Sequence, residues 1–221
     1  MIAQKIIEWS ISLPAIFLAI TVHEYAHGWV AYKCGDPTAK LAGRLTLNPI
    51  AHLDIIGAIC LLLFRFGWAK PVPVNFGMLR SPKRDMILVA VAGPGANILV
   101  AVLSAIFIRI MMTYLPNTDF GGLNDIIAKI IRPVLLMLGM SVIINLALAI
   151  FNVIPVPPLD GSKILMGFLP PYYAYQFARL EPYGFIILLI LIFTNIIQIV
   201  MMPILVFLIR IFLGQHAGLF F

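Results

Sequence analysis

Four long apolar runs constrain what this chain can fold into. They cover about residues 11–31, 86–112, 133–153 and 185–213, and each approaches or exceeds the roughly 20 residues that a helix needs to cross a bilayer. Hydrophobic residues make up 62% of the chain and charged residues only 11%, less than half of the roughly 25% that is typical of soluble domains. The sequence therefore predicts an integral membrane protein. It excludes a soluble enzyme, a disordered chain and a disulfide-stapled secreted module.

The expected fold is an all-α polytopic membrane protein with about four to six transmembrane helices. We expect one domain over residues 1–221, with a core at about 11–165 and one or two C-terminal spans at about 184–213. The last apolar run contains Pro203, so it is either one kinked span or a shorter pair. A further apolar run, 55–66, is too short to cross a bilayer and predicts a re-entrant or interfacial segment.

Basic residues indicate the orientation, because Lys and Arg accumulate in cytoplasmic loops. The loop after the second span offers only Lys129 and Arg132. The loop between the first two spans is much richer, with Lys33, Lys40, Arg44, Arg65, Lys70, Arg80, Lys83 and Arg84. We therefore expect the 32–85 and 154–184 loops on the cytoplasmic side and the N-terminus outside. No basic stripe with interleaved aromatic residues is present, so the net charge of +6 indicates contact with the lipid bilayer and no nucleic acid.

The first span contains an HExxH pattern, formed by His23, Glu24 and His27. A spacing of four places both imidazoles on one helix face, where they can share a zinc ion, and brings the glutamate close enough to deprotonate a metal-bound water. The alternative is a polar patch whose histidines bond to neighbouring carbonyls. An acidic residue inside a membrane costs about 3 kcal/mol, which favours a functional site.

A catalytic zinc site needs a third protein ligand beside water. Candidates are Asp160, His52, Asp54 and, more weakly, Asp36. Asp160 follows a proline-rich stretch at the end of the third predicted span, on the same side and at a similar depth as His27. Prolines prevent a continuous helix there and leave an unwound stretch that can line a cavity. This agreement favours Asp160 over a simple turn carboxylate in an Asp-Gly pair.

These motifs resemble the site-2 protease family of intramembrane zinc metalloproteases. The resemblance rests on HEYAH at 23–27 and NVIPVPPLDG at 152–161. Three further stretches match the smaller prokaryotic branch without PDZ or CBS domains, namely GDPTAK at 35–40, GRLTLNP at 43–49 and AGPGAN at 92–97. The similarity covers about residues 15–165.

The resemblance implies a zinc metalloendopeptidase with ligands His23, His27 and Asp160 and with Glu24 as catalytic acid and base. It implies cleavage of single-span, membrane-anchored substrates in regulated intramembrane proteolysis, in a prokaryotic inner membrane with the site toward the cytoplasm. The family's asparagine before the aspartate motif corresponds to Asn152, which could donate to the substrate or the oxyanion. Capping or bonding between helices is the structural alternative for this residue.

Other polar and small residues have weaker interpretations. Arg44, Leu45, Thr46 and Leu47 alternate as a short β-like loop that could pair with an extended substrate, although such a stretch is more often an ordinary loop. Gly93, Gly95 and Asn97 favour close helix packing, and Asn145 and Asn195 favour hydrogen bonds between helices. His52 and Asp54 are expected to bond to each other or to loop backbone.

Two other functions use the same residues. A zinc or cation transporter could employ the same intramembrane ligands, although carriers usually have paired discontinuous helices and this chain has a single HExxH motif. An inactive relative could serve as a binding scaffold, but a scaffold has no use for the buried carboxylate of Glu24.

Overall fold

The structure is a computed structural model that describes residues 2–64, 67–114 and 125–219. Within these ranges it is helical and contains no β-strand; the one isolated antiparallel bridge joins Leu53 to Ala69. The all-α fold predicted from the sequence is confirmed. Arg65, which the orientation argument includes among the loop cations, lies outside the described residues, and so does the side chain of Lys129.

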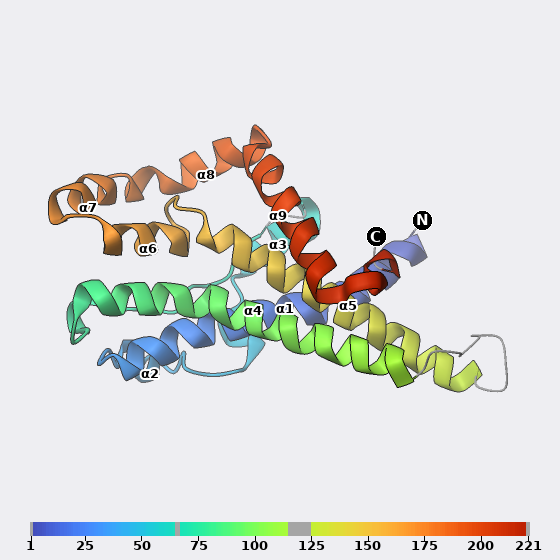
Figure 1. Ribbon diagram of the computed structural model, residues 1–221. Helices are drawn as coiled ribbons and strands as arrows, with labels where there is room; N and C mark the ends of the chain where they lie inside the picture. Colours follow the sequence, from blue (N-terminus) through green and yellow to red (C-terminus); the bar gives the residue numbers. More distant parts are fainter. Residues whose placement is uncertain (1, 65–66, 115–124, 220–221) are drawn as a thin grey trace.

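Three long helices form the body of the molecule (Figure 1). They are α1 (Ile2–Lys33), α4 (Pro82–Tyr114) and α5 (Asp125–Val153), and each packs against the other two. Prolines lie inside all three without ending them, at positions 14, 94 and 133. The first helix begins at Ile2, nine residues before the apolar run that is predicted to span the membrane. Hydropathy detects the part of a helix that suits a bilayer, whereas the backbone remains helical beyond it.

The C-terminal third forms a second layer over α4 and α5 (Figure 1). It comprises α6 (Asp160–Phe168), α7 (Pro171–Ala178), the short helix η3 (Glu181–Tyr183), α8 (Gly184–Phe193), α9 (Ile196–Leu213) and η4 (Gly214–Leu219). The predicted run 185–213 is therefore a pair of helices. The break is at Asn195, whose φ of 58° is left-handed and incompatible with a continuing helix. Asn195, which was predicted to form hydrogen bonds between helices, thus lies at the break between α8 and α9.

Short elements connect α1 to α4. They are α2 (Thr38–Leu41), η1 (Pro49–His52), α3 (Ile55–Phe64) and η2 (Phe76–Met78). The ten residues of α3 are too few to cross a bilayer, as the sequence indicated. The stretch 44–47 is a loop without a strand. The segment that begins at Gly67 runs back in irregular conformation toward the HExxH motif on α1.

The main apolar core lies between α4, α5 and α9. Its buried members are Ala101, Ala105, Ile108, Leu135, Val142, Leu146, Leu205, Ile209 and Leu213. A smaller cluster of Leu159, Leu188 and Ile197 joins the loop after α5 to α8 and α9. This second cluster fixes the loop that carries Asp160.

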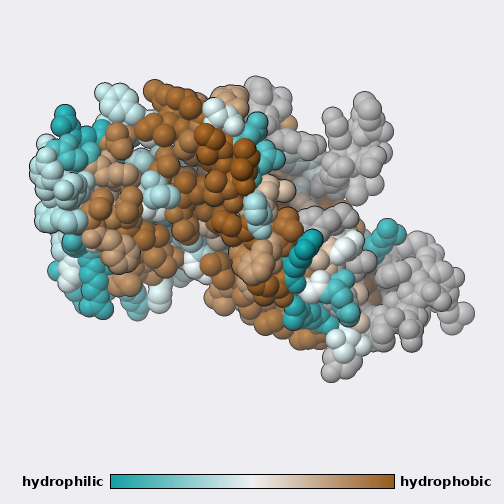
Figure 2. All heavy atoms as spheres, turned by 45° about the horizontal axis from the view of Figure 1, so that its top comes forward, coloured by the Kyte–Doolittle hydropathy of each residue, from teal (hydrophilic) through white to brown (hydrophobic). Residues whose placement is uncertain are grey.

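Four segments among the described residues are long and apolar enough to cross a membrane: Pro82–Thr113, Ile131–Val153, Pro171–Phe193 and Ile196–Leu213. The first predicted span, which lies on the helix α1, is not among them. Figure 2 shows hydrophobic residues over a broad area of one face, with hydrophilic residues gathered at its left end and again beside the grey atoms on the right. An apolar band between two polar ends suits a protein that is embedded in lipid.

Candidate metal centre

The helix α1 supplies two of the three side chains that converge on one point. His23 and His27 are one turn apart, and their Nε2 atoms are 3.0 Å from each other. Both residues lie in the C-terminal third of α1, which packs against α4 and α5. The HExxH spacing therefore places the imidazoles as the sequence predicted.

The third side chain comes from the start of α6. After α5 ends at Val153, the proline-rich stretch turns the chain back, and Asp160 is the first residue of the next helix. The turn is tight at Gly161, where a Cβ atom would clash with the carbonyl oxygens of Val153 and Ile154. Asp160 Oδ2 thereby lies 3.1 Å from His23 Nε2 and 3.2 Å from His27 Nε2.

The distances among these three atoms fit a tetrahedral metal ion. With bonds of about 2.0–2.1 Å to zinc, ligand atoms on a tetrahedron are about 3.3 Å apart. The observed separations are 3.0, 3.1 and 3.2 Å. Within the part of the chain that the structure describes, His23, His27 and Asp160 are the one group of three or more such residues able to hold a metal ion.

The hydrogen bonds of the imidazoles leave only acceptors facing this point. His27 Nδ1 lies 2.7 Å from the Val89 carbonyl, which can only accept, so Nδ1 carries the proton and Nε2 has the lone pair in the neutral ring. Asp160 Oδ2 is buried and receives no hydrogen bond. A proton on one Nε2 could form a hydrogen bond to only some of these atoms, whereas a metal cation can be bound by all three.

The tautomer of His23 is fixed through α4. Its Nδ1 lies 2.6 Å from Asn97 Oδ1, and Asn97 is fully buried. The Asn97 amide donates through Nδ2 to the Ala19 carbonyl at 3.0 Å and to Asn145 Oδ1 at 2.9 Å, so its oxygen must face the imidazole. His23 Nδ1 is therefore a donor and Nε2 is free to bind a metal. Such a partner on the second nitrogen is typical of metal-binding histidines.

Gly93 on α4 provides space beside the imidazoles. A Cβ at this position would lie 2.7 Å from His23 Nε2 and closer still to His27 Nε2. Any side chain here would therefore occupy the space in which a metal ion would sit. This fit explains the AGPGAN stretch better than helix packing alone does, since Gly93 and Asn97, one turn apart, both face the histidines.

Glu24 is held beside the three converging atoms and is not one of them. Its Oε2 accepts a hydrogen bond of 2.8 Å from the backbone N–H of Val72. Val72 lies between Pro71 and Pro73, which have no N–H group, so it is the only donor of this tripeptide. The segment that follows α3 thus positions the carboxylate next to the metal centre.

Comparison with known proteins agrees with this arrangement. The family model described as Peptidase family M50 matches residues 12–194. The chain belongs to peptidase family M50. It is 38% identical over 190 residues to "Putative zinc metalloprotease YwhC" of Bacillus subtilis, an alignment that covers 86% of this chain and 83% of that protein. It is 24% identical over 174 residues to a zinc metalloprotease of Methanocaldococcus jannaschii, covering 79% of this chain and 39% of that protein. No solved structure matches the chain.

Membership of family M50, also called the site-2 protease family, identifies the chain as a membrane zinc metalloprotease. The three converging atoms of His23, His27 and Asp160 fit the zinc that this assignment requires. The resemblance inferred from the sequence motifs is thereby confirmed. The transporter and the inactive scaffold both lack peptidase activity. Membership of a peptidase family therefore leaves these two alternatives without support.

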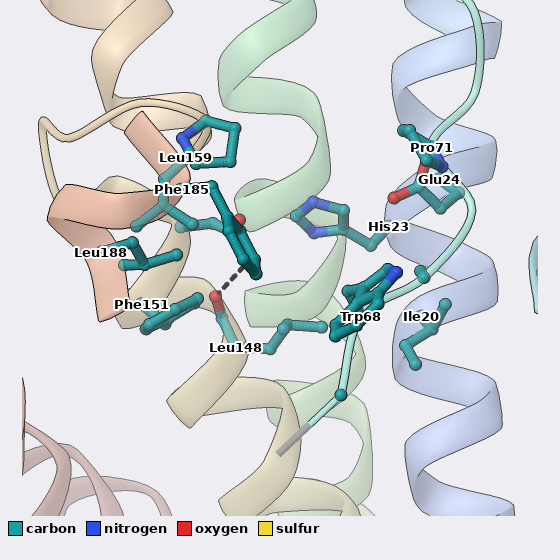
Figure 3. Close-up of a pocket in the computed structure, with 14 residues that line it drawn as sticks. Ile20, His23, Glu24, Trp68, Pro71, Leu148, Phe151, Leu159, Phe185 and Leu188 are labelled. Atoms are coloured by element: carbon teal, nitrogen blue, oxygen red, sulfur yellow. Dashed lines mark hydrogen bonds between the residues drawn. The ribbon is translucent and has the colours of Figure 1, made fainter. Parts of the chain in front are cut away.

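A cavity of about 420 Å³ adjoins the metal centre of this M50 chain (Figure 3). His23 and Glu24 face it from α1, and Trp68 and Pro71 from the segment after α3. The opposite wall comes from the end of α5, the following loop and the start of α8, with Leu148, Phe151, Leu159, Phe185 and Leu188. Trp68 and Phe185 meet edge to face across it, with ring centroids 6.1 Å apart.

The sequence-based candidates for substrate contact have different positions. Asn152 lines the cavity, but its Nδ2 donates to the Leu148 carbonyl of its own helix at 3.0 Å, the bond that Figure 3 marks. None of the described residues that line this cavity comes from the stretch 44–47. Arg44 donates instead to the Lys70 carbonyl at 2.7 Å and so braces the segment that carries Trp68 and Val72. Pairing of 44–47 with a substrate stays a prediction.

The other candidate ligands have structural partners. His52 bonds to the Thr46 carbonyl, which is loop backbone as predicted, at 2.8 Å. Asp54 instead accepts at 2.8 Å from the backbone N–H of Gly57 in the first turn of α3. Asp36 is fully buried and accepts from Thr38 and from the Asn75 N–H. Burial alone raises the pKa of Asp36, but these hydrogen bonds outweigh it and hold the pKa below its ordinary value.

Sequence reasoning missed three parts of the site. It did not assign Trp68 or Val72, and it treated Gly93 and Asn97 as packing residues. The Pro-Val-Pro sequence at 71–73 was an available signal for Val72, because it isolates one N–H donor. The hydrogen bond that Asn97 Nδ2 donates to Asn145 Oδ1 confirms the predicted bonding between helices at Asn145.

Proposed function

We propose that this M50 chain is an intramembrane endopeptidase that hydrolyses peptide bonds within or near transmembrane segments of single-span membrane proteins. The observation that carries the proposal is the position of the metal centre inside an apolar helix bundle. His27 and His23 precede the end of α1 at Lys33 by six and ten residues, which places them about 9 and 15 Å along the helix. Substrate would meet the site below the level of the lipid headgroups.

The proposal includes a multi-pass topology with the metal centre toward the cytoplasm. Basic residues gather where α1 ends and α4 begins, with Lys33, Lys40, Arg80, Lys83 and Arg84. This is the end of the bundle nearer to His27 and Asp160. The positive-inside tendency supports a cytoplasmic position for it.

The chain's own residues have distinct parts in the proposed hydrolysis. Zinc, when bound by His23, His27 and Asp160, supplies a Lewis acid and lowers the pKa of its water toward about 7. Glu24 accepts a proton at its carboxylate and later delivers it to the leaving amine. The Val72 N–H holds Glu24 Oε2 at 2.8 Å, so that the other oxygen can exchange the proton. Trp68 and Phe185 restrict the entry of water to the cavity.

The proposal extends to regulated intramembrane proteolysis, in which the substrates are membrane-anchored regulators such as anti-sigma factors or remnant signal peptides. The apolar lining of the cavity supports substrates that present hydrophobic segments. An extended peptide, unwound from its helix, exposes the carbonyl group that hydrolysis requires.

The test is cleavage of a single-span substrate reconstituted in liposomes with purified wild-type protein or the Glu24→Gln variant. The variant should retain zinc, measured by elemental analysis, and lose cleavage, because the amide cannot accept the proton. Glu181→Gln, a matched change at a surface residue paired with Lys163, should cleave normally. Undiminished cleavage by Glu24→Gln would refute the proposal, as would zinc flux into the liposomes that depends on His23 without any cleavage.

A further inference from the structure

A second cavity, of about 310 Å³, lies next to the first. It is bounded by the middle of α1, by α3 and by the C-terminal third of α5. Four residues line both cavities, namely Ile20, Gly67, Trp68 and Leu148. The indole of Trp68 stands beside Ile20 and above Leu148 in Figure 3, so it forms part of the partition between the two spaces.

Among the described residues, none that lines the second cavity has a charged side chain. Its walls are formed by Leu13, Ile16, Phe17, Ala19, Ile20, Leu53, Gly57, Ala58, Leu61, Leu62, Gly67, Trp68, Ile144 and Leu148. A water molecule needs two to four polar partners to be stable in a cavity, and these walls offer few. The cavity is therefore suited to an apolar group.

The outer wall of this cavity is α3, which is held in place by backbone contact. A Cβ on Gly57 would clash with the Trp68 carbonyl, and one on Gly67 would clash with the Gly57 carbonyl. The opposite face of α3 is exposed, with Ile55 and Ile56 more than half accessible. One side of α3 thus faces outward while the other side closes the second cavity and fixes Trp68 beside the first.

The second cavity is about three extended residues away from the metal centre. Phe17 precedes His23 by six residues on α1, a distance of about 9 Å along the helix. An extended peptide advances about 3.3 Å per residue. A substrate held extended at Glu24 would therefore bring a side chain about three residues from the scissile bond to this cavity.

We propose that the second cavity is a specificity subsite that accepts one large apolar side chain of the substrate, about three residues from the scissile bond. The proposal rests on the proposed endopeptidase function. Continuity with the cavity at His23 and Glu24 favours a substrate residue over a lipid chain as the occupant. Trp68 and Leu148, which line both cavities, separate this side chain from the reacting bond.

The test uses zinc-loaded protein in liposomes and single-span substrates with a mapped cleavage position. Positions two to five on each side of the scissile bond are changed singly to Ala, Leu or Trp, and kcat/KM is measured. One position should favour Leu over Ala by about 10-fold or more, since a single methylene group changes the specificity of an apolar pocket by 10–200-fold. The other positions should show a smaller preference.

Filling the cavity should abolish this preference. Ala58 lines only the second cavity, so Ala58→Phe should remove the preference for Leu at that position while the Ala substrate is still cleaved. Leu13→Trp fills the same space from α1 and should act alike. Ile59→Phe is the matched control, because the neighbouring residue on α3 is half exposed and does not line the cavity. Zinc content equal to that of the wild type verifies folding of each variant.

Three outcomes would overturn the proposal. The first is that no substrate position shows a size preference, and the second is that the preference is unchanged in both filled variants. The third is that the filled variants lose the same fraction of kcat/KM for every substrate, and that this loss varies with the length of the lipid chains. The last outcome would identify a lipid as the occupant. Failure of wild-type protein to cleave any substrate would instead contradict the endopeptidase function itself, so the two failures are distinguishable.

Discussion

Two carboxylates of this chain, the fully buried Asp36 and the partly buried Asp160, have opposite surroundings. Asp36, in the loop after α1, accepts hydrogen bonds from the Thr38 hydroxyl, the Thr38 N–H at 2.9 Å and the Asn75 N–H at 2.7 Å. Asp160, at the start of α6, directs a buried oxygen toward two imidazole nitrogens that are acceptors themselves. The first carboxylate is satisfied by the fold, whereas the second requires a cation.

The difference shows what separates a structural carboxylate from a metal ligand. Asp36 follows a glycine and Asp160 precedes one, and both were candidate ligands by residue type. They differ in their hydrogen-bond donors: the fold places three donors around Asp36 and none at the buried oxygen of Asp160. A buried polar group without a partner costs about 1–3 kcal/mol or more, so its retention indicates a function.

The largest expected effect is on metal binding by Asp160. The Asp160→Asn variant should lose zinc affinity by more than about 100-fold, the upper range for changes that affect ligands only indirectly. Zinc competition with a chelator measures this affinity. Cleavage should be lost with the metal, while Asp36→Asn should keep normal zinc affinity. Equal zinc affinity in the two variants would contradict the contrast between the two carboxylates.

The same variant sharpens the comparison in metal-free protein. An amide at position 160 offers N–H donors to the Nε2 atoms of His23 and His27, which the carboxylate cannot do. Without zinc, Asp160→Asn should therefore unfold at the same temperature as the wild type or above it. Asp36→Asn should unfold below the wild type under the same conditions, so the two substitutions should have effects of opposite sign.

A smaller effect is expected where a hydrogen bond orients a ligand. Asn97→Ala removes the acceptor of His23 Nδ1–H and should lower zinc affinity by about 10–100-fold. Asn97→Asp keeps an acceptor for the imidazole and should recover part of that affinity, even though it loses the donor to Asn145. Asn145 donates in turn to Ser141, whose hydroxyl bonds with that of Ser104 at 3.0 Å. Ser104→Ala, at the far end of these hydrogen bonds, is the control and should bind zinc normally. Equal affinities in all three variants would exclude an orienting role.

The effect of Asp36 on stability should be moderate and dependent on pH. Asp36→Asn should lower the free energy of unfolding by about 1.5–3 kcal/mol near neutral pH, the range for hydrogen bonds to a charged group. Since hydrogen bonds hold the folded-state pKa of Asp36 below its ordinary 3.8, its contribution is full above that value. It is lost as the pH falls through the lower folded-state pKa.

Thermal unfolding in detergent from pH 6 to pH 2 measures this difference. The gap between the wild type and Asp36→Asn should be constant at the upper end of the range and should shrink only below pH 3.8. A gap that closes above this pH would mean that the folded-state pKa is not depressed.

The smallest expected effect concerns one donor to Asp36. Thr38→Val removes the hydroxyl and keeps the backbone N–H, so it should lower the free energy of unfolding by about 1 kcal/mol. Zinc affinity and cleavage should be unchanged. A loss of stability as large as that of Asp36→Asn would show that the hydroxyl alone satisfies the carboxylate.

The sequence by itself determined the helical membrane class and the two metal-binding motifs. Apolar run lengths and HExxH spacing are local properties, and a helix converts a spacing of four into a shared face whatever surrounds it. The prolines before Asp160 likewise end α5 and let the next helix begin at that residue. These features require only the chain near each residue.

Tertiary structure decided the parts that depend on distant segments. Asn97 and Gly93 face the histidines only because α4 packs on α1, and Val72 reaches Glu24 only because the chain returns from α3. The break at Asn195 depends on a left-handed residue that composition does not reveal. The hydrogen-bond donors around a carboxylate also come from distant segments, as at Asp36, whose donor Asn75 is 39 residues away. The sequence could therefore name the candidate ligands, but it could not show which of them lack hydrogen-bond donors.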